Sequence, residues 1–122
     1  MQLPLPFRTR GTDRKELLLV AGPRTYHVEL PPRVEELAGR HGFHVSALSI
    51  RNQSTRWGAC SPAGRISLNW RLIQMPPGVR DYVILHELVH IQHLNHSARF
   101  WRALERLCPG YKEARRWLVK KA

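Results

Sequence analysis

Along the first part of the chain, apolar residues alternate with polar ones, and after a Met-Pro-Pro-Gly sequence they repeat at helical spacing instead. Alternation is typical of half-exposed β-strands. Segments 17–20 and 26–30 flank the turn-forming pair Gly22-Pro23 and predict an N-terminal hairpin. Segments 45–51 and 65–70 alternate in the same way, and the glycines and proline between them predict a second hairpin with a long connection.

The spacing of apolar residues predicts four helices, over residues 31–40, 79–94, 97–107 and 111–120. The first begins with two prolines, which suit a first helical turn, and Gly42 is placed to end it. The second has the clearest helical period. Strands followed by helices indicate an α+β fold in which a small antiparallel sheet precedes a helical half.

The length of 122 residues allows one domain, spanning residues 1–122, and leaves no room for a second independent core. A hydrophobic share of 43% with 24% charged residues is typical of a folded globular chain and excludes wholesale disorder. The longest apolar run, Leu17 to Ala21, is far shorter than the roughly 18 residues of a membrane span, and no secretory signal is recognisable. Because Cys60 and Cys108 are too few for a disulfide framework, we expect a cytoplasmic protein.

The chain is strongly basic: 20 Lys and Arg oppose 9 Asp and Glu, which gives a formal net charge of +11 and a pI near 11.0. Such a charge is typical of proteins that bind polyanions such as nucleic acid. It fits a small domain that arginine keeps soluble equally well, since net charge bears on association and not on fold. Basic residues cluster towards the C-terminus, at Arg99, Arg102, Arg106, Lys112, Arg115, Arg116, Lys120 and Lys121.

Within the 79–94 segment lies His86-Glu87-Leu88-Val89-His90, the H-E-x-x-H pattern. Residues four apart lie one turn apart on the same helix face, so the imidazoles of His86 and His90 can bind one cation. Glu87 is offset around the helix and can contact a metal-bound water without binding the metal. A hydrolytic zinc site needs three protein ligands and an open position, so the pattern predicts one Zn²⁺ and a third ligand elsewhere. The alternative, an amphipathic helix with two hydrogen-bonded histidines, is disfavoured because buried titratable groups are costly unless paired or metal-bound.

Three residues are candidates for the third ligand. His93 is near the same helix face as His86, but it lies about 10 Å from His86 along the helix axis. That distance is too large for both rings to bind one zinc ion through metal–nitrogen bonds near 2 Å. His96 lies beyond Asn95, which can end the helix in the left-handed conformation and turn His96 back towards the metal. We therefore favour His96, with His93 and Glu105 as alternatives, and we expect His93 to line the pocket.

Further motifs accompany this pattern between residues 54 and 101: S-T-R-W-G-A-C-S, G-R-I-S-L-N-W-R-L, D-Y-V-I-L-H-E-L-V-H and N-H-S-A-R-F-W. On these segments the chain resembles the YgjP-like metallopeptidase family, which groups with the SprT-like and Wss1-like zincins. The resemblance implies a minimal zincin-like domain in which His86, His90 and His96 bind zinc. It also implies that Glu87 acts as the general base.

We therefore predict a zinc metalloendopeptidase that acts on a protein or peptide substrate. Zinc lowers the pKa of its bound water to about 7, far below that of bulk water, Glu87 takes the proton, and the resulting hydroxide attacks a polarised carbonyl. Glu87 then passes the proton to the leaving amine. The oxyanion needs a second stabiliser, for which the sequence offers His93, Arg56, Trp57 and Tyr82. Glu105 and Asp81 are the nearest carboxylates that could hydrogen-bond the ligand histidines.

A different class of function is a nucleic-acid-binding module in which zinc is structural. The basic C-terminal residues favour it, but structural zinc is usually held by four protein ligands. The chain has no C-x-x-C sequence, and Cys60 and Cys108 are far from the histidines in sequence. The two interpretations merge in a protease that acts on DNA-bound proteins, because the SprT-like and Wss1-like relatives are associated with proteins crosslinked to DNA.

Overall fold

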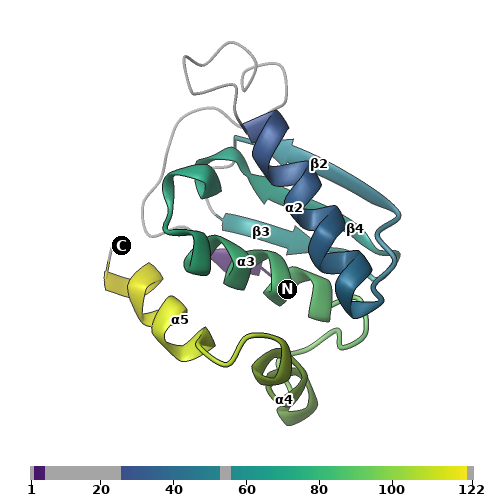
Figure 1. Cartoon of the computed structure of the whole chain (residues 1–122). Coiled ribbons are helices and arrows are strands. Elements are labelled where there is room, and N and C mark those ends of the chain that lie inside the picture. Colours follow the sequence, from purple (N-terminus) through teal and green to yellow (C-terminus); the bar gives the residue numbers. More distant parts are fainter. Residues whose placement is uncertain (1, 5–25, 53–55, 121–122) are drawn as a thin grey trace.

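The computed structural model describes residues 2–4, 26–52 and 56–120, which form an α+β fold (Figure 1). The sheet precedes the C-terminal helices, as the sequence predicts. The elements are strand β1 (Gln2–Pro4), helix α2 (Tyr26–His41), strands β2 (Ala47–Arg51), β3 (Arg56–Cys60) and β4 (Arg65–Asn69), a 3₁₀ helix η1 (Trp70–Gln74), and helices α3 (Pro77–Val89), α4 (Ala98–Leu107) and α5 (Tyr111–Lys120).

The sheet is mixed and has the strand order β1-β3-β4-β2. A tight turn joins β3 to β4, in which Gly64 adopts a φ of +83° and its N–H donates to the carbonyl of Ser61. Strand β4 lies between β3 and β2. The chain reverses direction between β2 and β3 and again between β3 and β4, so β4 runs parallel to β2. The predicted antiparallel pairing of segments 45–51 and 65–70 is therefore wrong. Strand β3 was not predicted, because Gly58 interrupts its alternation.

Helix α2 begins earlier than predicted. Residues 26–30 form its first turns instead of a strand, because Leu30 continues the buried stripe of Val34 and Leu37 at helical spacing. Both prolines, at 31 and 32, consequently lie inside the helix and not at its first position. The other half of the predicted hairpin, residues 17–20, lies outside the described residues. The predicted end of the helix is correct to within one residue, and Gly42 follows it with a φ of +74°.

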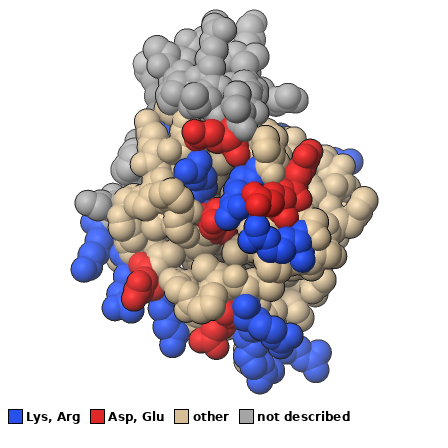
Figure 2. Space-filling model, in the orientation of Figure 1, with Lys and Arg blue, Asp and Glu red and all other residues tan. Residues whose placement is uncertain are grey.

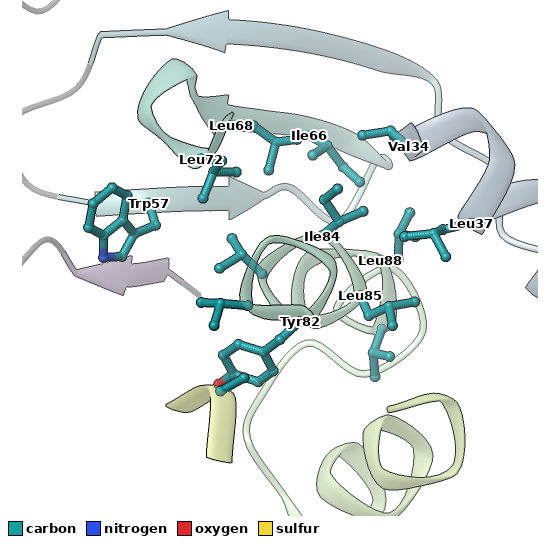
Figure 3. Close-up of a cluster of buried hydrophobic side chains, with 14 of the residues drawn as sticks. Val34, Leu37, Trp57, Ile66, Leu68, Leu72, Tyr82, Ile84, Leu85 and Leu88 are labelled. Atoms are coloured by element: carbon teal, nitrogen blue, oxygen red, sulfur yellow. The ribbon is translucent and has the colours of Figure 1, made fainter. Parts of the chain in front are cut away.

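Helix α3 is the centre of the fold. The sheet lies on one side of it, and α4 and α5 lie on the other (Figure 1). Figure 3 shows that apolar side chains from α2, the sheet and η1 meet those of α3. These buried residues include Val34, Leu37, Ile66, Leu68, Leu72, Ile84 and Leu88. Each such side chain contributes roughly 1.5–3 kcal/mol when fully buried, so α3 and the polar residues that it carries are firmly positioned.

The C-terminal end of α3 differs from the prediction in a way that matters for the site. The helix ends at Val89 and not near residue 94, and backbone N–H groups of residues 91 and 92 donate to carbonyls three positions earlier, closing a tight turn. Leu94 extends the apolar pattern in sequence, yet it is 50% exposed. Asn95 is not left-handed, since the positive φ values among the described residues belong to glycines. The early end of α3 redirects the chain towards α4.

Helices α4 and α5 follow the predicted ranges closely. Ser97 caps α4, and its side chain accepts a hydrogen bond from the N–H of Phe100 at 3.4 Å. Within the described chain, every helix is too short or too polar to cross a membrane.

Candidate metal centre

Of the three predicted ligands, His86 lies on α3, His90 is the residue that caps its C-terminal end, and His96 lies in the turn that follows. His86 and His90 are both 1% exposed, and the face of α3 that carries them is turned to Phe100 of α4. His96 lies one residue before the cap of α4 and is exposed to solvent. The turn that ends α3 early thus brings His96 back to the face of α3 that carries His86.

The three imidazoles converge through one nitrogen each. The Nε2 atom of His96 lies 2.9 Å from Nε2 of His90 and 3.1 Å from Nε2 of His86. Nitrogens that share a tetrahedral zinc at bond lengths of 2.0–2.1 Å are about 3.3 Å apart, so the spacing is close to that of a zinc site. Among the described residues, His86, His90 and His96 are the histidines, cysteines or carboxylates grouped in this way. Neither the His93 ring nor Glu105 is part of the group.

The outer nitrogens of the two buried histidines have acceptors of their own. Nδ1 of His90 donates to the backbone carbonyl of His93 at 2.9 Å, which leaves the lone pair of the neutral ring on Nε2. Nδ1 of His86 lies 3.1 Å from Oε2 of Glu87 and donates a hydrogen bond to it when the carboxylate is ionised. Hydrogen bonds of this kind orient histidine ligands in metal sites. Three imidazole nitrogens that meet this closely form a donor set that fits a metal ion.

The predicted outer-shell carboxylates do not make these contacts. Asp81 instead accepts two hydrogen bonds from Arg33 of α2, at 2.6 and 2.9 Å. Glu105 is exposed on α4. His93 contributes its backbone carbonyl, and its ring lies half-buried outside the group of three.

Burial keeps the converging imidazoles neutral. It lowers the pKa of His86 to about 3 and that of His90 to about 4, and it lowers the pKa of His96 as well. Neutral imidazole is the form that binds a metal, so the rings are in the ligating form at neutral pH.

Glu87 is fully buried between α3 and strand β3. Burial raises the pKa of its carboxyl group to about 8, and the positive charge of Arg56 on β3 acts in the opposite direction. Oxygen Oε1 has no hydrogen-bond partner among the described residues. Gly58 makes room for the side chain, because a Cβ atom there would lie 3.1 Å from Cγ of Glu87. In its ionised form, a carboxylate whose pKa is raised is a stronger base towards a neighbouring water.

A shell of aromatic rings surrounds the histidines. The buried ring of Phe100 lies 4.4 Å from His90, 4.8 Å from His96 and 5.1 Å from His86, measured between ring centroids. Trp101 lies 5.5 Å from His96. An apolar shell restricts water and lowers the local dielectric constant around a metal site. The sequence identified the histidines but not the contacts of Phe100 and Gly58. A glycine within a strand can signal a close approach, but β3 was not predicted as a strand.

The other residues predicted as oxyanion stabilisers lie on α3 and β3. Tyr82 lies on α3 one turn before His86, with the two rings 5.8 Å apart, and its buried hydroxyl has no partner within the described chain. Trp57 is buried on β3 (Figure 3), and its indole N–H is likewise unpartnered there. Arg56 is half-buried and close enough for its charge to act on Glu87.

Comparisons with known proteins agree with this geometry. The sequence profile of the YgjP-like metallopeptidase domain matches residues 8–121. The crystal structure of the metallopeptidase zymogen of Pyrococcus abyssi abylysin superposes with a TM-score of 0.65 at 25% identity, covering 74% of this chain and 91% of that one. A search of curated proteins found no significant match. Because the family profile spans nearly the whole sequence, the chain belongs to the YgjP-like metallopeptidase domain family.

Proposed function

We propose that this chain is a zinc-dependent endopeptidase in which His86, His90 and His96 bind the metal and Glu87 is the general base. The observation that carries the proposal is the convergence of three Nε2 atoms beside a buried carboxyl group. The family implies a metal ion, and a set of three imidazoles with one open position is the arrangement of catalytic zinc sites.

Each protein group has a distinct task in the proposed mechanism. When bound, zinc supplies an acidified water and a polarised substrate carbonyl. Glu87 takes a proton on Oε1, the oxygen without a partner among the described residues, and delivers it to the leaving amine. Oε2 stays hydrogen-bonded to Nδ1 of His86, which fixes the carboxylate while Oε1 exchanges the proton. Phe100 excludes water from the inner side of the site.

The oxyanion stabiliser is chosen from donor groups near the histidines and Glu87. The Tyr82 hydroxyl is supported by its place on the same face of α3 as His86 and by the lack of another partner in the described chain. Trp57 offers an indole N–H that has no partner among the residues that the structure describes, while Arg56 and the ring of His93 remain further candidates. The exposure of His96 leaves one side open to solvent, which favours access by a polypeptide chain over a closed small-molecule pocket.

A Glu87→Gln variant tests this proposal. It should retain one zinc per chain and lose peptide hydrolysis by about 10² or more, because the amide cannot accept the proton. Glu105→Gln, an exposed change on α4, is the matched control and should hydrolyse at the wild-type rate. Metal content is measured on protein purified without added metal, and hydrolysis on a peptide library. Equal activity of Glu87→Gln and wild type would contradict the role of Glu87.

A second function is supported by the charge of the C-terminal helices. Figure 2 shows lysines and arginines over the part of the molecule where α4 and α5 lie. Seven exposed cations on these helices are opposed by Glu105 and Glu113. A polyanion such as nucleic acid would be attracted to this surface. The domain would then be a nucleic-acid-binding module with structural zinc, or a protease that acts on DNA-bound proteins.

A further inference from the structure

A cation on α5, Arg115, lies one aromatic ring away from the candidate metal centre. Its guanidinium carbon Cζ is 5.1 Å from the ring centroid of Trp101. The Trp101 ring is in turn 5.5 Å from the ring of His96 and 6.3 Å from that of His86. Arg115 was not among the site residues that the sequence indicated, because only the tertiary structure brings α5 to the histidines.

The fold fixes the place of this arginine. Tyr111 lies one helical turn before Arg115, is buried, and stacks on the same Trp101 ring with centroids 5.5 Å apart and planes 24° apart. Ala114 and Leu118 are also buried and anchor α5. The start of the Arg115 side chain is therefore held by a packed helix, and its end is held by the cation–π contact with Trp101.

The N–H groups of the Arg115 guanidinium are available to a ligand. Arg115 is exposed and makes no hydrogen bond or ion pair with the described residues, apart from its cation–π contact. A cation held beside a site for another cation is electrostatically unfavourable unless an anion joins them.

The chemistry of the guanidinium indicates which anion. Its planar fork of N–H donors matches a carboxylate, which it binds through two parallel hydrogen bonds. An extended peptide advances about 3.3 Å per residue. Arg115 is separated from the ligand histidines by the Trp101 ring. A substrate carboxylate that binds Arg115 is therefore two or three residues from the peptide bond that lies at the metal.

We propose that Arg115, held against Trp101, is a specificity-determining residue that binds a carboxylate of the peptide substrate two or three residues from the scissile bond. This inference rests on the proposed peptidase function and names its substrate class. The carboxylate belongs either to an Asp or Glu side chain or to the C-terminus of the peptide, since both present the same chemistry to the guanidinium.

Matched peptides test the inference. Fluorogenic peptides cleaved by the wild type are made with Glu or Gln two and three residues from the cleaved bond on either side, and with a free or amidated C-terminus. We expect kcat/KM to favour the carboxylate form by about tenfold, which corresponds to about 1.4 kcal/mol. Arg115→Gln should abolish this preference, and Arg115→Glu should reverse it in favour of the Gln or amidated form. Arg116→Gln is the control, because Arg116 hydrogen-bonds the backbone of Lys112 and should keep the wild-type ratio.

The two carboxylate sources give different results. A preference that follows Glu over Gln indicates an acidic side chain, and one that follows the free acid over the amide indicates the C-terminus. Either result supports the inference if Arg115→Gln removes it. Equal ratios in wild type and Arg115→Gln would overturn the inference while leaving the peptidase function intact.

A binding measurement separates this inference from the function on which it rests. Titration calorimetry of the zinc-loaded Glu87→Gln protein with the same peptides needs no hydrolysis. The carboxylate peptide should bind about tenfold more weakly after Arg115→Gln is added, and Arg115→Lys, which keeps the charge without the planar fork, should show an intermediate loss. An unchanged affinity, or no measurable binding of either peptide, would contradict the inference.

Discussion

Gly58 on β3 provides the sharpest test of how the sheet positions the proposed general base. A Cβ atom at this position would lie 3.1 Å from Cγ of Glu87, 3.3 Å from Cδ2 of Leu68 and 3.3 Å from the carbonyl oxygen of Ser67. All three distances are shorter than an ordinary van der Waals contact of 3.4–4 Å. Two of these neighbours belong to β4, which is hydrogen-bonded to β3, so neither strand can move away alone.

The expected consequence of Gly58→Ala is a displaced carboxylate. Glu87 is fully buried and has to retreat by a few tenths of an ångström along α3. Overpacking of this kind costs about 1–3 kcal/mol in the free energy of unfolding. Because a catalytic group that is misplaced by about 1 Å can cost about 10²-fold, we expect kcat/KM to fall about tenfold. Zinc content should remain at one per chain, since none of the three atoms nearest to the added Cβ belongs to a histidine.

Gly39→Ala is the matched control for this substitution. Gly39 is exposed on α2, and a Cβ atom there would have no neighbour within 4 Å. Alanine in a helix is preferred to glycine by roughly 0.5–1 kcal/mol, so this variant should be slightly more stable and fully active. Urea unfolding, peptide hydrolysis and zinc analysis are compared for both variants. If Gly58→Ala hydrolysed peptide as fast as Gly39→Ala, strand β3 would not determine the position of Glu87.

Three further predictions concern the histidines and the basic surface. His96→Ala should lower zinc stoichiometry in metal analysis and His93→Ala should not; the reverse would show that the third ligand is misassigned. In the zinc-free protein His86 has a pKa of about 3. Since its ordinary pKa is near 6.5, the unfolded chain binds more protons between these values, and the stability present above pH 6.5 is lost as the pH falls. In urea unfolding, the wild type should therefore lose about 2 kcal/mol more stability between pH 7 and 5 than His86→Gln, which has no titrating imidazole at this position, and an equal loss in the two proteins would contradict the burial of a neutral His86. DNA affinity should fall steeply between 50 and 200 mM salt if α4 and α5 bind phosphates, and a flat response would remove the nucleic-acid function.

The sequence predicted the ligand residues of the site better than the backbone structure that positions them. Two histidines four residues apart on an apolar helix share a face wherever that helix packs, so the pairing of His86 and His90 follows from local geometry alone. The convergence of His96 with them was predicted through a left-handed Asn95. The structure achieves it instead by ending α3 at Val89, which an apolar pattern continuing through Ile91 and Leu94 conceals.

The errors in the fold have a common physical origin. The parallel pairing of β2 with β4 depends on the insertion of β4 between β2 and β3, and alternation within a strand carries no information about its neighbours. Residues 26–30 are too few to distinguish a strand from the first turns of α2 by period. The contacts of Gly58 with Glu87 and of Arg115 with Trp101 join distant segments, so they become visible only when the chain is folded.

X-ray absorption at the zinc edge tests the central claim most directly. The full chain, loaded with one zinc, should show three imidazole nitrogens at 2.0–2.1 Å and one further oxygen ligand from solvent. The His96→Ala variant should lose one imidazole from this set. A sulfur ligand near 2.3 Å, from Cys60 or Cys108, or a fourth protein ligand that closes the site, would contradict a catalytic centre built from His86, His90 and His96.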